Sequence, residues 1–145
     1  MPHLTLQNSI GGPLIDLWIG ASNARAEALT RVGKQAPAPL LIRGLIDTGA
    51  SSTCIDPQIL KTLELTPTGE VAIHTPSTGS APHFAYQYDV SLTLVHPNHK
   101  LEIGTVPVIE ATLSGQGIQA LIGRDVLEQC LFIYDGQTGT FTLAF

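Results

Sequence analysis

An apolar segment that leads directly into an acid and a glycine turn is the feature that most constrains the fold of this chain. Residues 40–46 are nearly all apolar, which is typical of a buried strand. Asp47 follows at once, and the next three residues complete a short turn: Thr48, Gly49 and Ala50. A strand that ends in this way predicts a carboxylate held rigidly beside a low-dielectric interior.

Much of the remaining chain alternates apolar and polar residues with a period of two, which predicts strands. The expected strands are Leu4–Leu6, Leu14–Ile19, Leu40–Ile46, Val71–Thr75, Phe84–Val95, Leu101–Glu110, Ala120–Ile122, Leu131–Tyr134 and Thr140–Phe145. Asp56 and Pro57 suit the N-cap and first position of a short helix, and Gly123–Cys130 is expected to form another. Many short strands with one or two short helices predict a mainly β fold.

With 145 residues, the chain is long enough for one domain with its own core. Residues 21–39 break the strand pattern and are rich in Ala and polar residues. We expect a loop insertion there, with one helical turn around Ala24–Leu29, and a single domain over residues 1–145. Trp18 is expected to pack in the core or beside a substrate cleft.

The net charge of -5, without a basic run, argues against nucleic-acid binding because phosphate contacts need clustered Lys and Arg. Only 13% of residues are charged, against about a quarter in an average soluble domain. This low share predicts that some apolar surface is buried in an oligomer.

No run of 18 apolar residues is present, so no membrane span is expected, and the first residues lack the features of a signal peptide. We therefore expect a cytoplasmic location, although the chain could also be a domain of a longer protein. Cys54 and Cys130 are too few for a disulfide scaffold. They are expected to be buried thiols in a reducing compartment.

A second motif, Ala-Leu-Ile-Gly-Arg-Asp, occupies residues 120–125. Gly123 lacks a side chain, which permits a close approach of the backbone to another segment. Asp125 and Glu128 have the spacing of a capping box at a helix start. Asp56 is therefore interpreted as a helix cap, and Asp125 as a cap or an ion-pair member.

Asp-Thr-Gly-Ala at residues 47–50, followed by Ile-Gly-Arg-Asp at residues 122–125, resembles the retropepsins, the proteases of retroviruses and their cellular and bacterial relatives. The ends of the chain, residues 2–6 and 140–145, are similar to the terminal strands that interleave across the retropepsin dimer. The resemblance covers nearly the whole chain except residues 21–39. It implies a closed, mainly β barrel of the acid-protease type, with one short C-terminal helix and a β-hairpin flap.

The resemblance also implies a chemistry in which two carboxylates activate a water, one as general base and the other as general acid. The chain has a single Asp-Thr-Gly and is too short for two lobes, so a homodimer would bring Asp47 together with its symmetry mate. The expected substrate is an extended peptide or protein. No metal or organic cofactor is implied, and His96 and His99 have no evident third metal ligand nearby.

The resemblance gives the neighbours of Asp47 supporting roles. Thr48 would hydrogen-bond across the dimer, Gly49 would bring its N–H close to the carboxylate, and Ala50 would line the first subsite. Gly123 would lie beneath the loop, and Arg124 would make a structural ion pair or bond to the active-site or terminal region.

Two further features concern substrate recognition. Ser51 and Ser52 stand where many retroviral members place an acid that helps to bind the substrate backbone. Subsites that favour apolar side chains are expected from Ala50, Ile55, Val71, Ile73 and Ile122.

Residues 74–83 lie where a retropepsin carries its flap, a lid over the substrate. The residues expected to contact substrate are Thr75, Pro76, Ser77, Thr78, Gly79 and Ser80. If the turn centres on residues 78–79, His74 and His83 face each other, and their joint protonation would open the flap. The alternative is an ordinary exposed hairpin.

These patterns together predict an aspartic endopeptidase that is active as a homodimer. Two alternatives remain open at this point. The chain could be a non-catalytic module of the same fold that binds peptide and dimerises, or a self-processing protease domain of a longer precursor.

Overall fold

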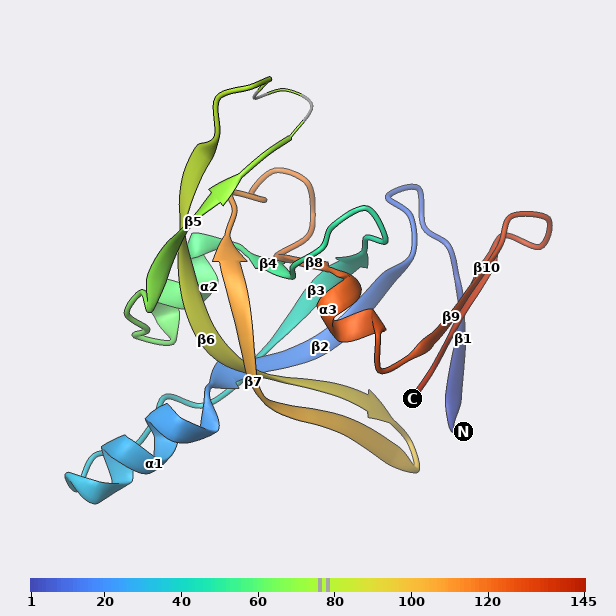
Figure 1. The fold of residues 1–145 in the computed structure, drawn as a ribbon. Helices are drawn as coiled ribbons and strands as arrows, with labels where there is room; N and C mark the ends of the chain where they lie inside the picture. The colour runs from blue at the N-terminus through green and yellow to red at the C-terminus, as the bar shows by residue number, and fades with distance from the viewer. Residues whose placement is uncertain (76, 78) are drawn as a thin grey trace.

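The computed structural model describes residues 1–75, 77 and 79–145, and its strands form a barrel with a smaller sheet beside it (Figure 1). The strands are β1 (His3–Gln7), β2 (Leu14–Ala21), β3 (Leu40–Ile46), β4 (Cys54–Ile55), β5 (Gly69–Ile73), β6 (His83–His96), β7 (His99–Glu110), β8 (Ala120–Ile122), β9 (Leu131–Asp135) and β10 (Thr140–Ala144). The helices are α1 (Asn23–Arg31), α2 (Pro57–Thr62) and α3 (Arg124–Leu127).

The barrel is closed by six strands in the order β2-β3-β8-β4-β7-β6, because β6 pairs back onto β2. Strand β5 pairs with β6 only, and the two form a hairpin that extends beyond the ring. The prediction of a mainly β, closed barrel is therefore confirmed. The sequence pattern did not predict β4, which lies beside β8 and contributes only two residues.

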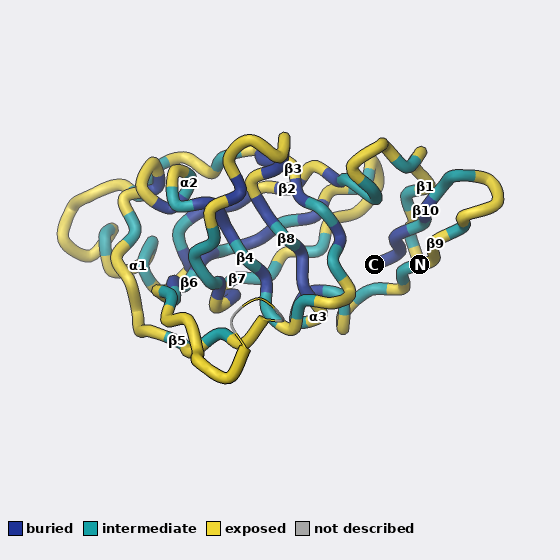
Figure 2. The backbone as a smooth tube through the Cα atoms, turned by 90° about the horizontal axis from the view of Figure 1, so that it is seen from above, coloured by how far each residue is buried: buried dark blue, intermediate teal, exposed yellow. Residues whose placement is uncertain are grey.

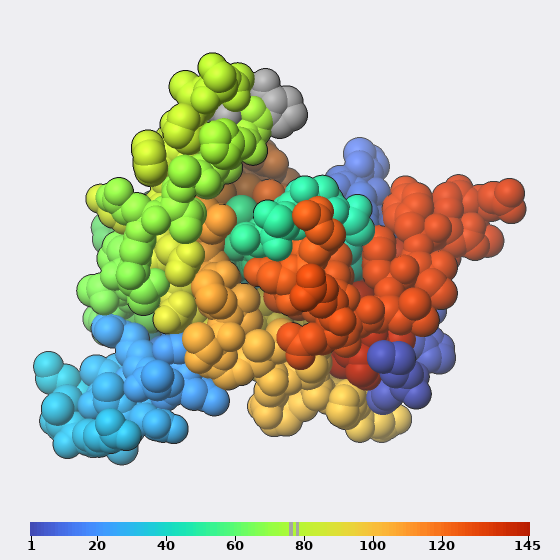
Figure 3. Space-filling view, viewed as in Figure 1, coloured from blue at the N-terminus to red at the C-terminus, as the bar shows by residue number. Residues whose placement is uncertain are grey.

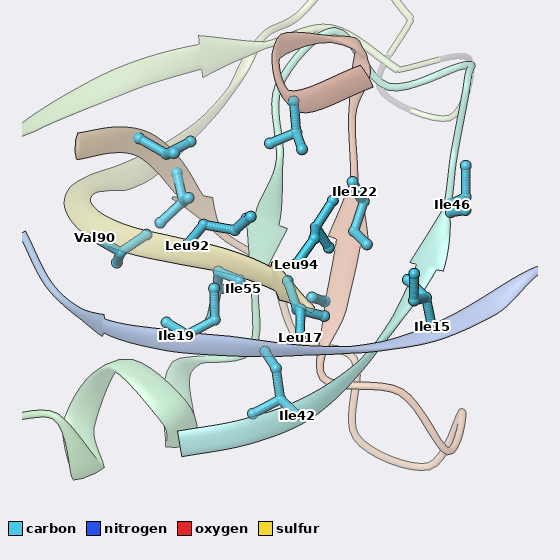
Figure 4. Packing of buried hydrophobic residues seen from close by; sticks show 14 of the residues in the cluster. Ile15, Leu17, Ile19, Ile42, Ile46, Ile55, Val90, Leu92, Leu94 and Ile122 are labelled. Carbon is cyan, nitrogen blue, oxygen red and sulfur yellow. The ribbon is translucent and has the colours of Figure 1, made fainter. Parts of the chain in front are cut away.

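The core lies inside the barrel, where alternate residues of each strand point inward (Figure 4). On β6, Val90, Leu92 and Leu94 are fully buried, while the neighbouring Val95 is 50% exposed. Leu17 of β2, the strand that pairs with β6 to close the barrel, belongs to the same cluster. Burial of such apolar side chains is the main favourable contribution to folding.

The chain termini meet in a separate antiparallel sheet of order β1-β10-β9, next to the barrel (Figure 1). Thr5 pairs with Thr142, and their hydroxyl oxygens lie 2.8 Å apart. Strand β10 thus has both neighbours within its own chain. Interleaving of the terminal strands with those of a second chain stays a prediction; within one chain, β1 lies along β10.

The insertion at residues 21–39 is more regular than the expected loop, because residues 23–31 form a helix of nine residues. Ser22 caps it by accepting a hydrogen bond from the backbone N–H of Arg25 at 3.2 Å. None of its residues is buried (Figure 2), and Figure 1 shows it projecting from the barrel, away from the β5–β6 hairpin. The insertion therefore does not cover the hairpin side of the molecule.

Helix α2 begins as predicted, with Pro57 in its first turn and Asp56 as its N-cap. One Asp56 oxygen accepts from the N–H of Gln58 and the other from the N–H of Leu113, each at 2.9 Å. The prediction for Trp18 is wrong, since this side chain is 40% exposed on the outer wall of the barrel. Within the described part of the chain, no helix combines the length and apolarity needed to cross a membrane.

Adjacent residues of β6 allow a matched test of this packing. Leu94→Ala should lower the free energy of unfolding by about 2–5 kcal/mol, because it leaves a cavity in the core. Val95→Ala, on the solvent face, should change it by at most about 0.5 kcal/mol. Urea unfolding of both variants at one protein concentration measures the difference, and equal losses would contradict the assigned orientation of β6.

Candidate active site

Asp47 lies at the end of β3, where a short turn fixes its position. Its backbone N–H donates to the carbonyl oxygen of Ile122 on β8 at 2.9 Å, and its carbonyl oxygen accepts from the N–H of Ala50 at 3.2 Å. The N–H of Gly49 donates to the Asp47 Oδ1 at 2.9 Å. The carboxylate is therefore oriented by its own turn, and the turn is tied to the barrel wall.

Arg124 joins this turn to the start of α3. Its backbone N–H donates to the carbonyl oxygen of Ala50 at 2.9 Å, and its Nη1 donates to that of Thr48 at 2.8 Å. Of the two bonding regions expected for Arg124, the structure thus shows the active-site turn. The three ion pairs among the described residues do not include it.

Gly123 lies beneath the turn, and its missing side chain has a clear cause. A Cβ atom built at this position would lie 2.7 Å from the carbonyl carbon of Ser52 and 3.0 Å from the nitrogen of Thr53. Both neighbours are backbone atoms, so they could not move aside without shifting the loop. The sequence prediction of a close backbone approach at Gly123 is confirmed.

Thr53 and Asp125 form a polar lock under the loop that sequence reasoning missed. Asp125 Oδ2 accepts from the N–H of Thr53 at 2.9 Å, and its Oδ1 accepts from the Thr53 hydroxyl at 2.7 Å. The same hydroxyl oxygen accepts from the N–H of Gly123 at 3.1 Å. Thr53 has no exposed surface, so these bonds satisfy polar groups that water cannot reach.

The predicted capping box at Asp125 and Glu128 is wrong. The N-cap of α3 is Gly123, which has no side chain to donate or accept. Asp125 uses its carboxylate for Thr53 and for the N–H of Val126 at 2.9 Å. The spacing of Asp125 and Glu128 predicted a cap. The Asp125 carboxylate instead accepts a hydrogen bond from the buried hydroxyl of Thr53, which is far away in the sequence.

A groove of about 770 Å³ lies between the β5–β6 hairpin and the barrel. Figure 3 shows the hairpin rising above the loop that follows Asp47. The groove is lined by Cys54, Glu70, Ile73, Thr75, Ser77, His83, Phe84, Ala85, Tyr86, Glu110, Ala111, Thr112 and Leu121. The residues of the active-site turn, 47–50, are not part of this lining.

Of the residues expected to form apolar subsites, Ile73 lines the groove, Ala50 and Val71 do not, and the other two lie in the core. Ile55 is 0% exposed and Ile122 is 1% exposed, so both pack in the core. Their neighbours Cys54 and Leu121 line the groove instead. The sequence identified the right strands, but a shift of one residue along a strand exchanges the two faces.

The predicted flap coincides with the loop between β5 and β6. Thr75 and Ser77 line the groove, and their hydroxyl oxygens lie 2.8 Å apart. Gly79 has a φ of 60°, which suits a turn residue without a side chain, and Ser80 is exposed. The other two predicted contacts, Pro76 and Thr78, lie outside the described residues.

The predicted face-to-face pair of histidines is wrong. His83 pairs with Ile73 across the hairpin, and His74 lies beyond the end of the ladder. Joint protonation of a directly opposed pair therefore has no basis here.

Neither cysteine is fully buried, in contrast to the expectation, and both are free thiols. Burial raises the pKa of Cys54, and the negative charges of Asp125 and Asp47 raise it further. Burial also raises the pKa of Cys130. Over the described residues, no group of three or more His, Cys, Asp or Glu side chains is placed to hold a metal ion.

A closed barrel in which a strand delivers Asp-Thr-Gly-Ala above an Ile-Gly-Arg-Asp segment defines a protein of the retropepsin-like class. A family model described as "Aspartyl protease" matches residues 33–126, so the chain belongs to this aspartyl protease family.

Two solved structures are similar to the chain. A retropepsin-like aspartic protease from Rickettsia conorii has 16% sequence identity and a TM-score of 0.61, over 99% of this chain and 90% of that one. The retroviral protease-like domain of Ddi1 from Leishmania major is a weaker match, with 10% identity and a TM-score of 0.42, over 86% and 83%. The first likeness shows the shared fold. No curated protein matches the chain.

The lock beneath the loop is testable by changing one hydroxyl group. Thr53→Val should lower the free energy of unfolding by about 1–3 kcal/mol, because it leaves the Gly123 N–H and part of Asp125 without partners. Thr53→Ser keeps the hydroxyl and should retain most of the stability. Chemical unfolding compares the two variants, and a valine variant at least as stable as the serine variant would contradict the role of the lock.

The raised pKa of Cys54 predicts slow alkylation. In a Cys130→Ser background, the rate with iodoacetamide should reach half its maximum only above pH 9.0, the ordinary pKa of this thiol. Asp47→Asn should move that midpoint to lower pH, because a negative neighbour disfavours the thiolate. Asp16→Asn, at the exposed ion pair with Arg43, is the control. A midpoint below pH 9.0, or one that Asp47→Asn leaves in place, would refute this prediction.

Proposed function

We propose that the protein is an aspartic endopeptidase whose active form is a homodimer, with one Asp47 carboxylate from each chain. The observation that carries this proposal is the fixed orientation of Asp47 by the Gly49 N–H, within a chain of the aspartyl protease family. A carboxylate positioned in advance is what a general acid or base requires.

A second chain is needed because Asp125 is unsuited to complete the pair. Both oxygens of Asp125 already accept hydrogen bonds from Thr53, at 2.9 and 2.7 Å. Asp47 is half-buried and Thr48 is exposed, and no other described residue hydrogen-bonds the Thr48 hydroxyl. A symmetry mate facing this turn would meet an accessible carboxylate and an available hydroxyl.

The surface composition supports association. Strand β9 is an edge strand of the terminal sheet, and three of its side chains are about half exposed: Leu131, Ile133 and Tyr134. Exposed apolar side chains on an unpaired strand edge are favourable contact surfaces for another chain. Because β10 has both neighbours within its own chain, the edges available to a partner are those of β1 and β9.

In the proposed reaction, two carboxylates hold one water and share one proton, since two like charges at close range disfavour full ionisation. The ionised carboxylate accepts a proton from the water as its oxygen bonds to the peptide carbonyl carbon. The protonated carboxyl group gives its proton to the carbonyl oxygen. As this tetrahedral intermediate collapses, one of its hydroxyl groups returns a proton to the ionised carboxylate and re-forms a C=O bond. The C–N bond breaks, and the amine leaves with the proton of the other carboxyl group, so the pair again holds one proton.

The β5–β6 hairpin is proposed as the flap that covers the substrate. It stands over the groove with Thr75 and Ser77 on its inner side. An extended peptide laid in this groove could pair with backbone groups of the hairpin as an added strand. Closure would also exclude water from the reacting peptide bond.

Replacing Asp47 tests both the chemistry and the stoichiometry. Asp47→Asn should abolish cleavage of a peptide library between pH 4 and 7, because an amide cannot accept the proton from water. When wild type and variant are mixed at constant total concentration, activity should fall as the square of the wild-type fraction, since only dimers with two Asp47 residues are active. Product formation measured by mass spectrometry gives both results.

The Asp16→Asn variant serves as a control, because Asp16 lies on the outer barrel wall, paired with Arg43. A linear dependence on the wild-type fraction would show that one chain suffices. Equal inertness of wild type and Asp47→Asn would favour a peptide-binding module that does not cut.

A further inference from the structure

Two carboxylates lie in the groove beneath the hairpin, although its other lining is largely apolar. Glu70 comes from β5 and Glu110 from the last position of β7. Glu70 is exposed and Glu110 is half-buried. The three ion pairs among the described residues involve neither of them, and neither side chain hydrogen-bonds another described residue.

Strand register places these carboxylates on one face of the sheet. Glu70 pairs with Tyr86 across β5 and β6. On the other side of β6, Tyr88 pairs with Val108. Two residues further along these antiparallel strands, Tyr86 lies opposite Glu110, so both side chains are on the same face of the sheet. All three side chains line the groove. Consistent with this arrangement, burial raises the pKa of Tyr88, and the nearby negative charge of Glu110 raises it further.

Glu110 occupies a position where the strand pattern calls for an apolar residue. Val106 and Val108, on the same face of β7, are 4% and 0% exposed. Glu110 continues this row at the point where the barrel opens into the groove. A partly buried carboxylate loses hydration, and without a cation no ion pair compensates for that loss. A ligand that brings a positive charge would therefore be favoured there.

Resting on the proposed function, we propose that this groove selects a peptide substrate with a lysine or arginine side chain. The charged end would pair with Glu110 and Glu70. The apolar stem would lie along Tyr86 and Leu121, as long basic side chains commonly do on apolar surfaces, and an arginine could also stack on the tyrosine ring. This replaces the expectation of purely apolar subsites.

Two further titratable side chains line the groove, His83 from the hairpin and Cys54 from the barrel side. At pH 7, glutamate side chains are ordinarily ionised and histidine side chains ordinarily neutral. The pKa of Cys54 is raised from its ordinary value of 9.0, so its thiol is neutral at pH 7 and adds no charge to the groove. The groove therefore offers the negative charge of two glutamates to a cation at pH 7.

A positional library of extended peptides tests the selection at pH 7, with each position in turn occupied by lysine or by its uncharged counterpart norleucine. At one position, wild type should cleave the lysine peptides about tenfold faster, the size expected of one charge-assisted contact. In Glu110→Gln that ratio should fall to near one. Glu70→Gln, at an exposed position, should lower the ratio in the same direction.

Glu102→Gln provides the matched control, because it removes the same charge from the same strand but lies outside the groove, beside Lys100. It should keep the wild-type ratio. Cleavage with no lysine preference, or a preference that both groove variants retain, would overturn the inference.

A binding measurement separates this inference from the proposed function. The Asp47→Asn protein should bind the lysine peptide about tenfold more tightly than the norleucine peptide, by calorimetry. If wild type cleaves nothing while this difference persists, the groove assignment stands and the endopeptidase proposal fails. Equal binding of the two peptides would count against the groove assignment even if cleavage occurs.

Discussion

The close contact between Gly123 and the loop after Asp47 is the constraint on which the rest of the site depends. The backbone of residues 52–53 lies within 3.0 Å of the place where a Cβ atom would stand. Two main chains can approach this closely only if their polar groups are satisfied, which the hydroxyl of Thr53 and the carboxylate of Asp125 achieve. The position of Asp47 follows, because its turn is bonded to Ile122 on one side and to Arg124, through Ala50, on the other.

Much of this site could be predicted from the sequence because its key parts are local. An apolar strand followed by Asp-Thr-Gly-Ala, and a strand followed by Gly-Arg-Asp, each identify a turn from neighbouring residues. The lock between Thr53 and Asp125 could not be predicted in this way, because it joins residues 72 positions apart. Its signal in the sequence is weak: a threonine between two serines and a cysteine, which reads equally well as part of a polar loop.

The errors in the groove and in the insertion have a different physical origin. Ile55 and Ile122 are apolar and close to the motif, but strand register decides which face each residue occupies, and a two-residue strand gives no alternation to read. The sequence predicted only one turn of helix α1. The helix buries none of its residues, so it lacks the apolar periodicity that marks most helices. Its start depends instead on the hydrogen bond accepted by Ser22.

The position of Glu110 links the fold to substrate choice. The inner row of β7 passes from Val106 and Val108 in the core to Glu110 at the groove, so one strand supplies both barrel packing and a charge in the cleft. Folding alone gives no reason for that charge, since an apolar side chain there would continue the core without loss of hydration. A half-buried carboxylate beside an aromatic face is more readily explained by the ligand that the groove receives than by the stability of the barrel.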